Sequence, residues 1–260
     1  MAMDERRRRY LEAMGVQAWR RRGGAMPPED AAVAPAEHPP VVVEQGHDAL
    51  IPVGEPRPPV LTPAAELDDA EVAAMDWEAL AARVARCTRC PELVANRTQT
   101  VFGVGNRAAE VMVIGEAPGQ EEDKQGEPFV GRAGQLLNEM LRAMGFAREQ
   151  VYIANVLKSR PPNNRDPRPE EAAHCEPYLK RQIALIKPRL ILSVGRISAQ
   201  NLLKTDTPIG KLRGQVHRYQ GIPLVVTYHP AYLLRSPLEK RKSWDDLKLA
   251  LRTLREARAP

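Results

Sequence analysis

Residues 111–134 read VMVIGEAPGQEEDKQGEPFVGRAG and decide the fold of this 260-residue chain. The stretch opens with a short, wholly apolar run, residues 111–114, of the kind typical of a strand buried on both faces. Gly115 breaks the run, and a loop containing Pro118 leads to a helix that we expect to begin near Arg132. A strand that ends in such a turn places its loop at the carboxyl edge of an α/β sheet, where open sheets bind ligands. The stretch therefore predicts an active site on this loop.

Three more apolar runs follow, and they alternate with helical patterns. With residues 111–114, the expected strands are 151–156, 190–194 and 224–228. The expected helices are 132–144, 169–186, 198–204 and 239–256, preceded by a helix that Asp76 caps and that runs to Cys87. This alternation predicts a parallel sheet with helices on both faces. The predicted fold class is therefore α/β, a three-layer α/β/α arrangement around a central, mainly parallel four-stranded sheet.

Composition divides the chain into three parts. Residues 1–24 form a basic N-terminal segment with seven arginines against three acids, and a short helix is expected there. Residues 25–75 are rich in proline and alanine and carry ten acids against one arginine, which predicts a disordered acidic linker. Residues 76–260 form the predicted folded domain and carry a net charge of +10. Such a charge suits a polyanionic partner such as nucleic acid, but a merely soluble basic surface explains it equally well.

The same patterns bear on the surroundings of the protein. Residues 1–24 are expected to be either a solvated tail or a peptide that docks on a partner protein or DNA. No apolar run reaches the ~18–20 residues of a membrane span, and no secretory signal is recognised, so a cytoplasmic monomer without membrane association is expected. Three cysteines cannot form a disulfide framework, so the C-x2-C pair at Cys87 and Cys90 indicates metal or redox chemistry.

Polar side chains follow three of the expected strands. Glu116 follows the first strand, Asn155 lies near the end of the second, and His229 follows the last. Parallel strands bring these residues to one edge of the sheet, and Phe129 can fold back over them. The amide offers a donor and an acceptor to a base edge, and the ring offers a stacking surface. Each residue alone is also typical of a structural role, but together they predict a pocket for a planar heterocycle.

Four motifs then occur in order along the chain: GEAPGQEED from Gly115, GEPFVGRAGQLL from Gly126, NVLKSRPPNNRDP from Asn155 and YHPAYLLR from Tyr228. These motifs resemble those of the bacterial and archaeal family-four uracil-DNA glycosylases, which carry an iron–sulfur cluster. The resemblance covers about residues 76–255. It implies a monofunctional base-excision repair enzyme that flips a uracil nucleotide out of DNA, hydrolyses its N-glycosidic bond and leaves an abasic site.

The resemblance also implies a role for particular residues. The implied catalytic residues are Glu116 and His229, and His229 would stabilise the departing uracil anion at its O2 atom. The implied uracil-binding residues are Gly115, Ala117, Phe129 and Asn155. The implied DNA-binding residues are Arg160, Arg165, Leu233 and Arg235, with the loop after Pro230 entering the duplex.

A cluster of this family is held by four cysteines, and the resemblance implies Cys87, Cys90 and Cys175 as three of them. The fourth position is Ser159, whose harder oxygen binds iron less readily than a thiolate. Three alternatives stay open: a [4Fe–4S] cluster with Ser159, water or a nearby group as fourth ligand, a three-iron cluster, or a lost cluster. Zinc, with His174 as a ligand, is a further alternative. A retained structural cluster is favoured, and no catalytic metal is expected.

Two other functions are weighed against the enzyme. The first is a DNA-binding or scaffold protein that keeps the fold with weak or no glycosylase activity. The second is a small-molecule nucleotide hydrolase with GEAPG as its phosphate loop. The sequence lacks the lysine of a Walker motif, which disfavours the hydrolase.

Overall fold

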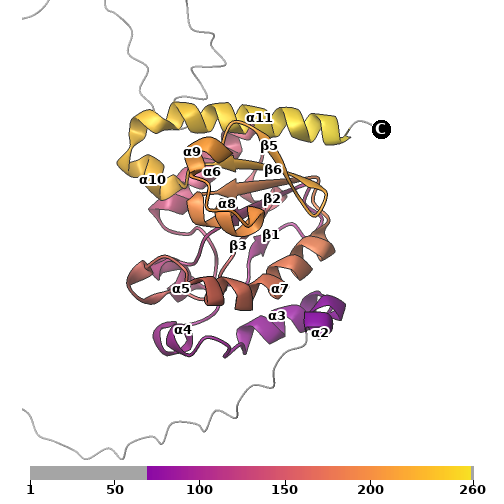
Figure 1. Cartoon of the computed structure of the whole chain (residues 1–260), viewed down its shortest axis with the longest axis vertical. Coiled ribbons are helices and arrows are strands. Elements are labelled where there is room, and N and C mark those ends of the chain that lie inside the picture. The colour runs from indigo at the N-terminus through magenta and orange to yellow at the C-terminus, as the bar shows by residue number, and fades with distance from the viewer. Residues whose placement is uncertain (1–68, 259–260) are drawn as a thin grey trace, which may run out of the picture. The chain divides into compact units, whose positions relative to one another are not determined.

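The apolar run after Glu110 forms strand β2 (Val111–Gly115), which lies inside a six-stranded sheet (Figure 1). The computed structural model describes residues 69–258. The strand order is β1-β3-β2-β4-β6-β5. The four inner strands are parallel and correspond to the predicted ones: β2, β3 (Tyr152–Asn155), β4 (Leu190–Val194) and β6 (Ile222–Thr227). Two antiparallel edge strands were not predicted, β1 (Val104–Gly105) and β5 (Val216–Tyr219), so the predicted number of four strands is wrong.

The pairing of β2 fixes where a ligand can bind. It pairs with β3 on one side, where Gly115 lies opposite Asn155, and with β4 on the other, where Ile114 lies opposite Ser193. The chain therefore leaves β2 for one neighbour and later returns to its other side. Such a reversal of strand order opens a crevice at the carboxyl ends of the strands. The predicted α/β fold with a mainly parallel sheet is confirmed.

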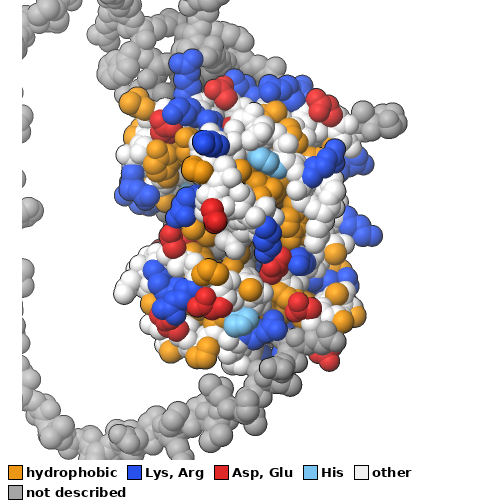
Figure 2. All heavy atoms as spheres, in the orientation of Figure 1, with side chains coloured by type: hydrophobic (Ala, Val, Ile, Leu, Met, Phe, Trp, Pro, Cys, Tyr) orange, Lys and Arg blue, Asp and Glu red, His pale blue; other side chains and the backbone are white. Residues whose placement is uncertain are grey.

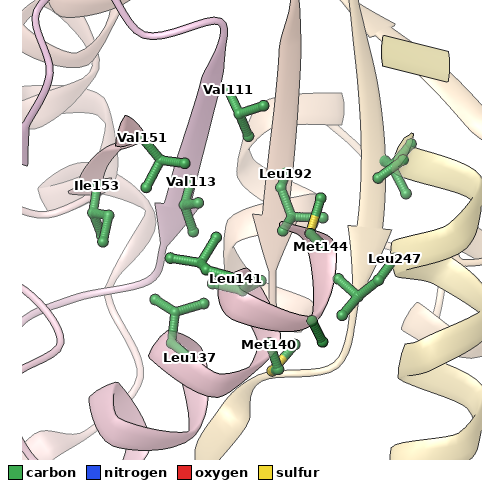
Figure 3. Packing of buried hydrophobic residues seen from close by; sticks show 14 of the residues in the cluster. Val111, Val113, Leu137, Met140, Leu141, Met144, Val151, Ile153, Leu192 and Leu247 are labelled. Carbon is green, nitrogen blue, oxygen red and sulfur yellow. The ribbon is translucent and has the colours of Figure 1, made fainter. Parts of the chain in front are cut away.

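Alternate side chains of β2 enter different cores on the two faces of the sheet. Val111 and Val113 pack in the cluster that includes α6 (Arg132–Met144) and α11 (Lys240–Arg258) (Figure 3). Met112 and Ile114 pack in the cluster that includes α7 (Pro169–Ile186) and α8 (Arg196–Leu203). All four are fully buried, which explains why the strand has no polar alternation.

The four predicted long helices are confirmed within about two residues, and the helix capped by Asp76 is confirmed with one change. The Asp76 carboxylate accepts the backbone N–H of Ala79 at 2.8 Å, and helix α3 (Trp77–Ala85) ends before Cys87 instead of at it. Short helices that the sequence did not reveal are α4 (Pro91–Asn96), α5 (Gln120–Gln125), α9 (Ile209–Leu212) and α10 (Pro230–Arg235), with the 3₁₀ turns η1 (Arg148–Gln150), η2 (Pro162–Asn164) and η3 (Pro237–Glu239).

The predicted linker extends too far. Its last residues form helix α2 (Asp69–Ala74), and Val72 of this helix is fully buried in a small cluster with Leu80 and Tyr178. The basic segment 1–24, its docking role and the linker up to residue 68 lie outside the described residues. Within residues 69–258, none of the helices combines the length and the apolar character needed to cross a membrane.

Candidate active site

A cavity of about 400 Å³ opens at the carboxyl ends of β2, β3 and β6. Five of the six predicted catalytic and base-binding residues line it: Glu116, Ala117, Phe129, Asn155 and His229. A larger hollow of about 690 Å³ lies between α6 and α11, but its Glu110 is already paired with Arg258. The smaller cavity is therefore the candidate active site, because the polar groups converge there.

Asn155 is the most informative residue of this cavity. The residue is only 1% exposed, and neither Oδ1 nor Nδ2 has a hydrogen-bond partner among residues 69–258. Buried amides are nearly always satisfied, so an unpaired donor and acceptor facing a cavity indicate a ligand that supplies both partners. The missing sixth residue, Gly115, lies behind this amide. A Cβ atom at Gly115 would lie 2.4 Å from Asn155 Oδ1 and 2.6 Å from Phe129 Cζ, so only glycine lets the amide and the ring approach each other.

Phe129 supplies the predicted aromatic wall. Its ring centre lies 5.6 Å from that of His229, with an angle of 32° between the planes, and the residue is 6% exposed. The backbone of Phe129 has a left-handed φ of 55°, a conformation that costs energy unless its surroundings impose it. Gly134 allows this conformation, because a Cβ atom at residue 134 would lie 1.8 Å from the carbonyl oxygen of Phe129.

Two charged residues that the sequence did not single out hold the Phe129 loop. The Glu122 carboxylate accepts three backbone N–H groups, those of Gly119, Val130 and Gly131, at 2.9–3.1 Å. The Arg148 guanidinium donates to the carbonyl oxygens of Pro128, at 2.6 Å, and of Phe129, at 3.3 Å. Glu122 was detectable, since an acid three residues after Gly119 is typical of a helix start. Arg148 had no sequence signal because its partners lie about twenty residues away.

Lys158 holds the backbone of Asn155, and the sequence analysis did not identify it. It is 2% exposed, and its Nζ donates to the carbonyl oxygen of Asn155 at 2.9 Å and to Gln182 Oε1 at 2.7 Å. Burial lowers the pKa of Lys158 to about 7. These bonds fix the end of β3, so the amide of Asn155 is presented by a rigid backbone.

His229 presents a defined tautomer to the cavity. Its Nδ1 accepts the backbone N–H of Ala231 at 3.2 Å, so the neutral ring carries its proton on Nε2. Burial, with a further contribution from the positive charge of Arg235, lowers the pKa of His229 to about 4. The ring is therefore a neutral N–H donor at physiological pH. Gly195, with a φ of +100°, leaves room for this ring, since its Cβ would come within 3.1 Å of the imidazole side chain.

The pKa of Glu116 is raised, whereas that of His229 is lowered. Burial, and then the negative charge of Asp166, raise the pKa of Glu116 to about 7, while Arg196 opposes the rise. Asp166 and Arg196 form an ion pair of 2.6 Å beside the cavity. A carboxyl group that titrates near neutrality inside a cleft is typical of catalytic sites.

The four predicted DNA-binding residues have different surroundings. Leu233 is 1% exposed and packs in the core with α6 and α11, so its assignment to the duplex is wrong. The segment after Pro230 is helix α10 instead of a loop. Arg165 lines the cavity but forms a two-bond pair with Glu171 at 2.6 and 2.9 Å. Arg160 Nε donates to Asn164 Oδ1 at 2.8 Å, and Arg235 lines the cavity.

Three exposed apolar side chains lie close to Leu233 in the sequence. Tyr232 and Leu234 are each 37% exposed, and Leu238 in η3 is 92% exposed. In the same part of the chain, residues 235–242 contain Arg235, Lys240, Arg241 and Lys242. On the face drawn in Figure 2, Lys and Arg side chains outnumber Asp and Glu along the end of the molecule formed by α10 and α11. This surface combines apolar tips with positive charge next to the cavity.

The three predicted cysteine ligands lie near one another. Burial, and then the neighbouring Cys175 and Cys87, raise the pKa of Cys90 to about 12, which places the three thiols within electrostatic reach. Cys90 Sγ lies 3.3 Å from His174 Nδ1, and the Tyr178 hydroxyl donates to Cys87 Sγ at 3.4 Å. In residues 69–258, no group of three His, Cys, Asp or Glu side chains is arranged to hold one metal ion. Zinc requires all its ligands within about 2.3 Å of a single centre and stays an alternative prediction.

A multi-iron cluster takes soft thiolate donors, each of which binds a different iron in a [4Fe–4S] cluster. Three sulfur donors come from the segment before α4 and from α7. The fourth position holds a serine oxygen instead of a sulfur. Ser159 is 5% exposed, and its Oγ accepts a hydrogen bond from Arg97 at 2.8 Å.

The fold and the cavity define an α/β protein with polar and aromatic side chains gathered where its parallel strands end. The family model of the uracil DNA glycosylase superfamily matches residues 102–248. Type-4 uracil-DNA glycosylases of Archaeoglobus fulgidus and Thermotoga maritima are 46% and 47% identical over 170 and 161 residues, which is 62% and 61% of this chain and 85% and 83% of those proteins. That of Pyrobaculum aerophilum is 43% identical over 185 residues, 67% of this chain and 93% of its own. The chain therefore belongs to the uracil-DNA glycosylase superfamily and, within it, to the type-4 family.

Proposed function

We propose that this protein excises uracil from DNA by hydrolysing the N-glycosidic bond and leaving an abasic site. The observation that carries the proposal is the buried, unpaired amide of Asn155, which faces a cavity also lined by Phe129 and His229. Uracil presents a carbonyl acceptor at C4 and an N–H donor at N3, which match this donor and acceptor. Cytosine presents an amino group at C4 and fails the match.

The mechanism follows from the groups around the base. A stacked uracil cannot reach the cavity, so the nucleotide is extruded at a cost of a few kcal/mol. Scission of the bond between C1′ and N1 leaves a cationic sugar and a uracil anion. The Nε2–H of His229 donates to O2 of the anion, and the Glu116 carboxylate stabilises the sugar cation or orients the attacking water. Arg148 and Glu122 keep Phe129 in its stacking position.

The direct experiment measures uracil release from a single-stranded uracil oligonucleotide under single-turnover conditions. Release by the wild-type protein and its loss in Asn155→Ala support the proposal. A folded wild-type protein that binds the oligonucleotide but releases no uracil would favour the DNA-binding or scaffold alternative instead.

The raised pKa of Glu116 predicts a pH profile. If the carboxylate is the active form, kcat/KM rises with pH and levels off above about 7, because the group loses its proton through that range. His229, with its pKa near 4, stays neutral throughout. Asp166→Asn removes a negative charge that raises the pKa of Glu116, so the rise should move to lower pH. A profile of Asp166→Asn that coincides with the wild type, or one that moves to higher pH, would contradict this role of Glu116.

We further propose that the exposed side chains of α10 and η3 contact DNA, with Leu238 replacing Leu233 as the residue that enters the duplex. Leu238 follows Arg235 of the cavity wall by three residues and is almost completely exposed. Apolar side chains inserted between base steps offset the cost of unstacking. Arg235 and Arg160 would contact phosphates, which fix position and not sequence.

The Leu238 proposal predicts a difference between duplex and single strand. Leu238→Ala should slow uracil release from duplex DNA about 5- to 30-fold, because the lost contact is worth about 1–2 kcal/mol. Release from a single strand, which has no stack to open, should change less than about 2-fold. Val216→Ala, at an exposed aliphatic residue of β5, is the matched control and should leave both rates unchanged. Equal slowing of both substrates by Leu238→Ala would contradict insertion.

We also propose that the protein carries an iron–sulfur cluster on Cys87, Cys90 and Cys175. Three neighbouring thiols at the positions that match the cysteine ligands of the family support this cofactor. When bound, the cluster supplies a covalent link between the segment before α4 and helix α7, and it takes no part in glycosidic bond scission. The monomeric state, the cytoplasmic location and the docking role of residues 1–24 stay predictions.

A further inference from the structure

Ser159 occupies the position at which the family places its fourth iron ligand, and the structure gives this serine another partner. Arg97 Nη1 donates to Ser159 Oγ at 2.8 Å, and Arg97 Nη2 donates to the carbonyl oxygen of Cys87 at 2.6 Å. One guanidinium thus joins residue 159 to the segment that carries the first cysteine. These are the same two parts of the chain that a cluster with four cysteines would join.

The surroundings of Arg97 show that this contact is built into the fold. Arg97 is the last residue of the turn that ends α4, and its own N–H bonds to the carbonyl oxygen of Leu93. The next residue, Thr98, donates its N–H to both carboxylate oxygens of Asp123 at 3.0 Å. The N–H of Val101 donates to the carbonyl oxygen of Lys158 at 2.8 Å, directly before Ser159. Residues 97–101 are therefore fixed alongside residues 158–159.

The chemistry of the two side chains disfavours an iron–oxygen bond here. Iron in a sulfide cluster prefers soft thiolates, and a serine would have to lose its proton to replace one. A guanidinium has five donors, keeps its charge and accepts nothing, so it is satisfied by a neutral hydroxyl and a carbonyl oxygen. The two bonds of Arg97 hold the Ser159 oxygen toward the guanidinium.

We propose that residue 159 no longer binds iron, that the cluster is held by three thiolates only, and that the Arg97–Ser159 hydrogen bond replaces the missing covalent link. The inference depends on the proposed cluster, and it assigns Arg97 and Ser159 a structural function in a protein with one cysteine fewer than its family pattern. Ser159 and Arg97 are positioning residues in this proposal.

The first test compares iron and sulfide per chain in three purified variants with those of the wild type. Ser159→Ala should retain the wild-type content and absorption spectrum, because no ligand is removed. Cys175→Ser should lose most of the iron. Ser243→Ala is the matched control, since Ser243 is also a buried, hydrogen-bonded serine and lies on α11. Loss of iron from Ser159→Ala equal to that from Cys175→Ser would overturn the inference.

The second test is thermal unfolding of the same holoproteins. Ser159→Ala should lower the Tm by roughly 3–10 °C, since a charge-assisted hydrogen bond is lost. Arg97→Met should lower it at least as much, and the double variant should be no less stable than Arg97→Met alone. Additive effects of the two substitutions would show that the two side chains act independently and would overturn the proposed link.

Ser159→Cys separates this inference from the cofactor proposal. A restored fourth thiolate should slow iron extraction by a chelator about 10-fold or more relative to the wild type. An unchanged extraction rate would mean that residue 159 cannot reach the cluster, which overturns its assignment as the fourth position. Wild-type protein free of iron under anaerobic preparation would overturn both the cluster and the inference, while uracil release, measured separately, would still test the proposed function.

Discussion

Replacement of His229 by alanine is expected to slow uracil release about 10²- to 10³-fold, the usual cost of one donor that stabilises a developing oxyanion. The physical reason lies in the ring's surroundings. The Nδ1 atom is occupied by the N–H of Ala231, so the only proton of the neutral ring is on Nε2. Burial keeps that ring neutral, with a pKa of about 4, so it stabilises the anion by donating a hydrogen bond from Nε2–H.

The measurement is single-turnover release from a uracil oligonucleotide at saturating protein. His229→Gln keeps an N–H donor on a side chain of similar length and should recover part of the loss. His217→Ala is the matched control, because His217 lies on edge strand β5 and bonds the carbonyl oxygen of Leu212 outside the cavity. A His229→Ala protein that stays folded and releases uracil at the wild-type rate would remove His229 from the mechanism.

The positions of the site residues could be predicted because they depend on strand ends, which the apolar pattern of the sequence reveals. Wholly apolar runs identify buried parallel strands, and parallel strands end at one edge. Gly115, Asn155 and His229 each fall within two residues of such an end, so their meeting required only the fold class. The helices α6 and α7 were equally predictable, because long apolar periodicity fixes the buried face.

Features that depend on tertiary packing could not be predicted in this way. Leu233 and Leu234 are neighbours in a short helix, and only its contact with α6 and α11 decides that Leu233 is buried and Leu234 half exposed. Strand β1 has two residues, too few for a pattern, and Val216 at the start of β5 is 46% exposed. The partner of Ser159 was hidden for the same reason, since Arg97 lies 62 residues earlier in the chain.

Asn155→Ala is expected to reduce the rate of uracil release about 10²- to 10³-fold. This loss is as large as that expected for His229→Ala, but its cause is different. The substitution removes the donor to O4 and the acceptor from N3–H of the base, and it leaves both groups of the bound uracil without their side-chain partner. The buried, unpaired state of the amide in the free protein means that no internal hydrogen bond is lost with it. Stability should therefore change little, whereas activity should fall strongly.

Asn155→Asp tests whether the amide also selects the base. A carboxyl group has no fixed donor, so the ratio of uracil to cytosine release should fall about 10²-fold or more, even if some uracil release remains. Asn201→Ala, at an asparagine of α8 whose amide bonds the carbonyl oxygen of Ile197, is the matched control and should alter neither rate. If Asn155→Asp keeps the wild-type preference for uracil, discrimination must lie in the backbone of the cavity. The amide would then serve only to hold the base in place.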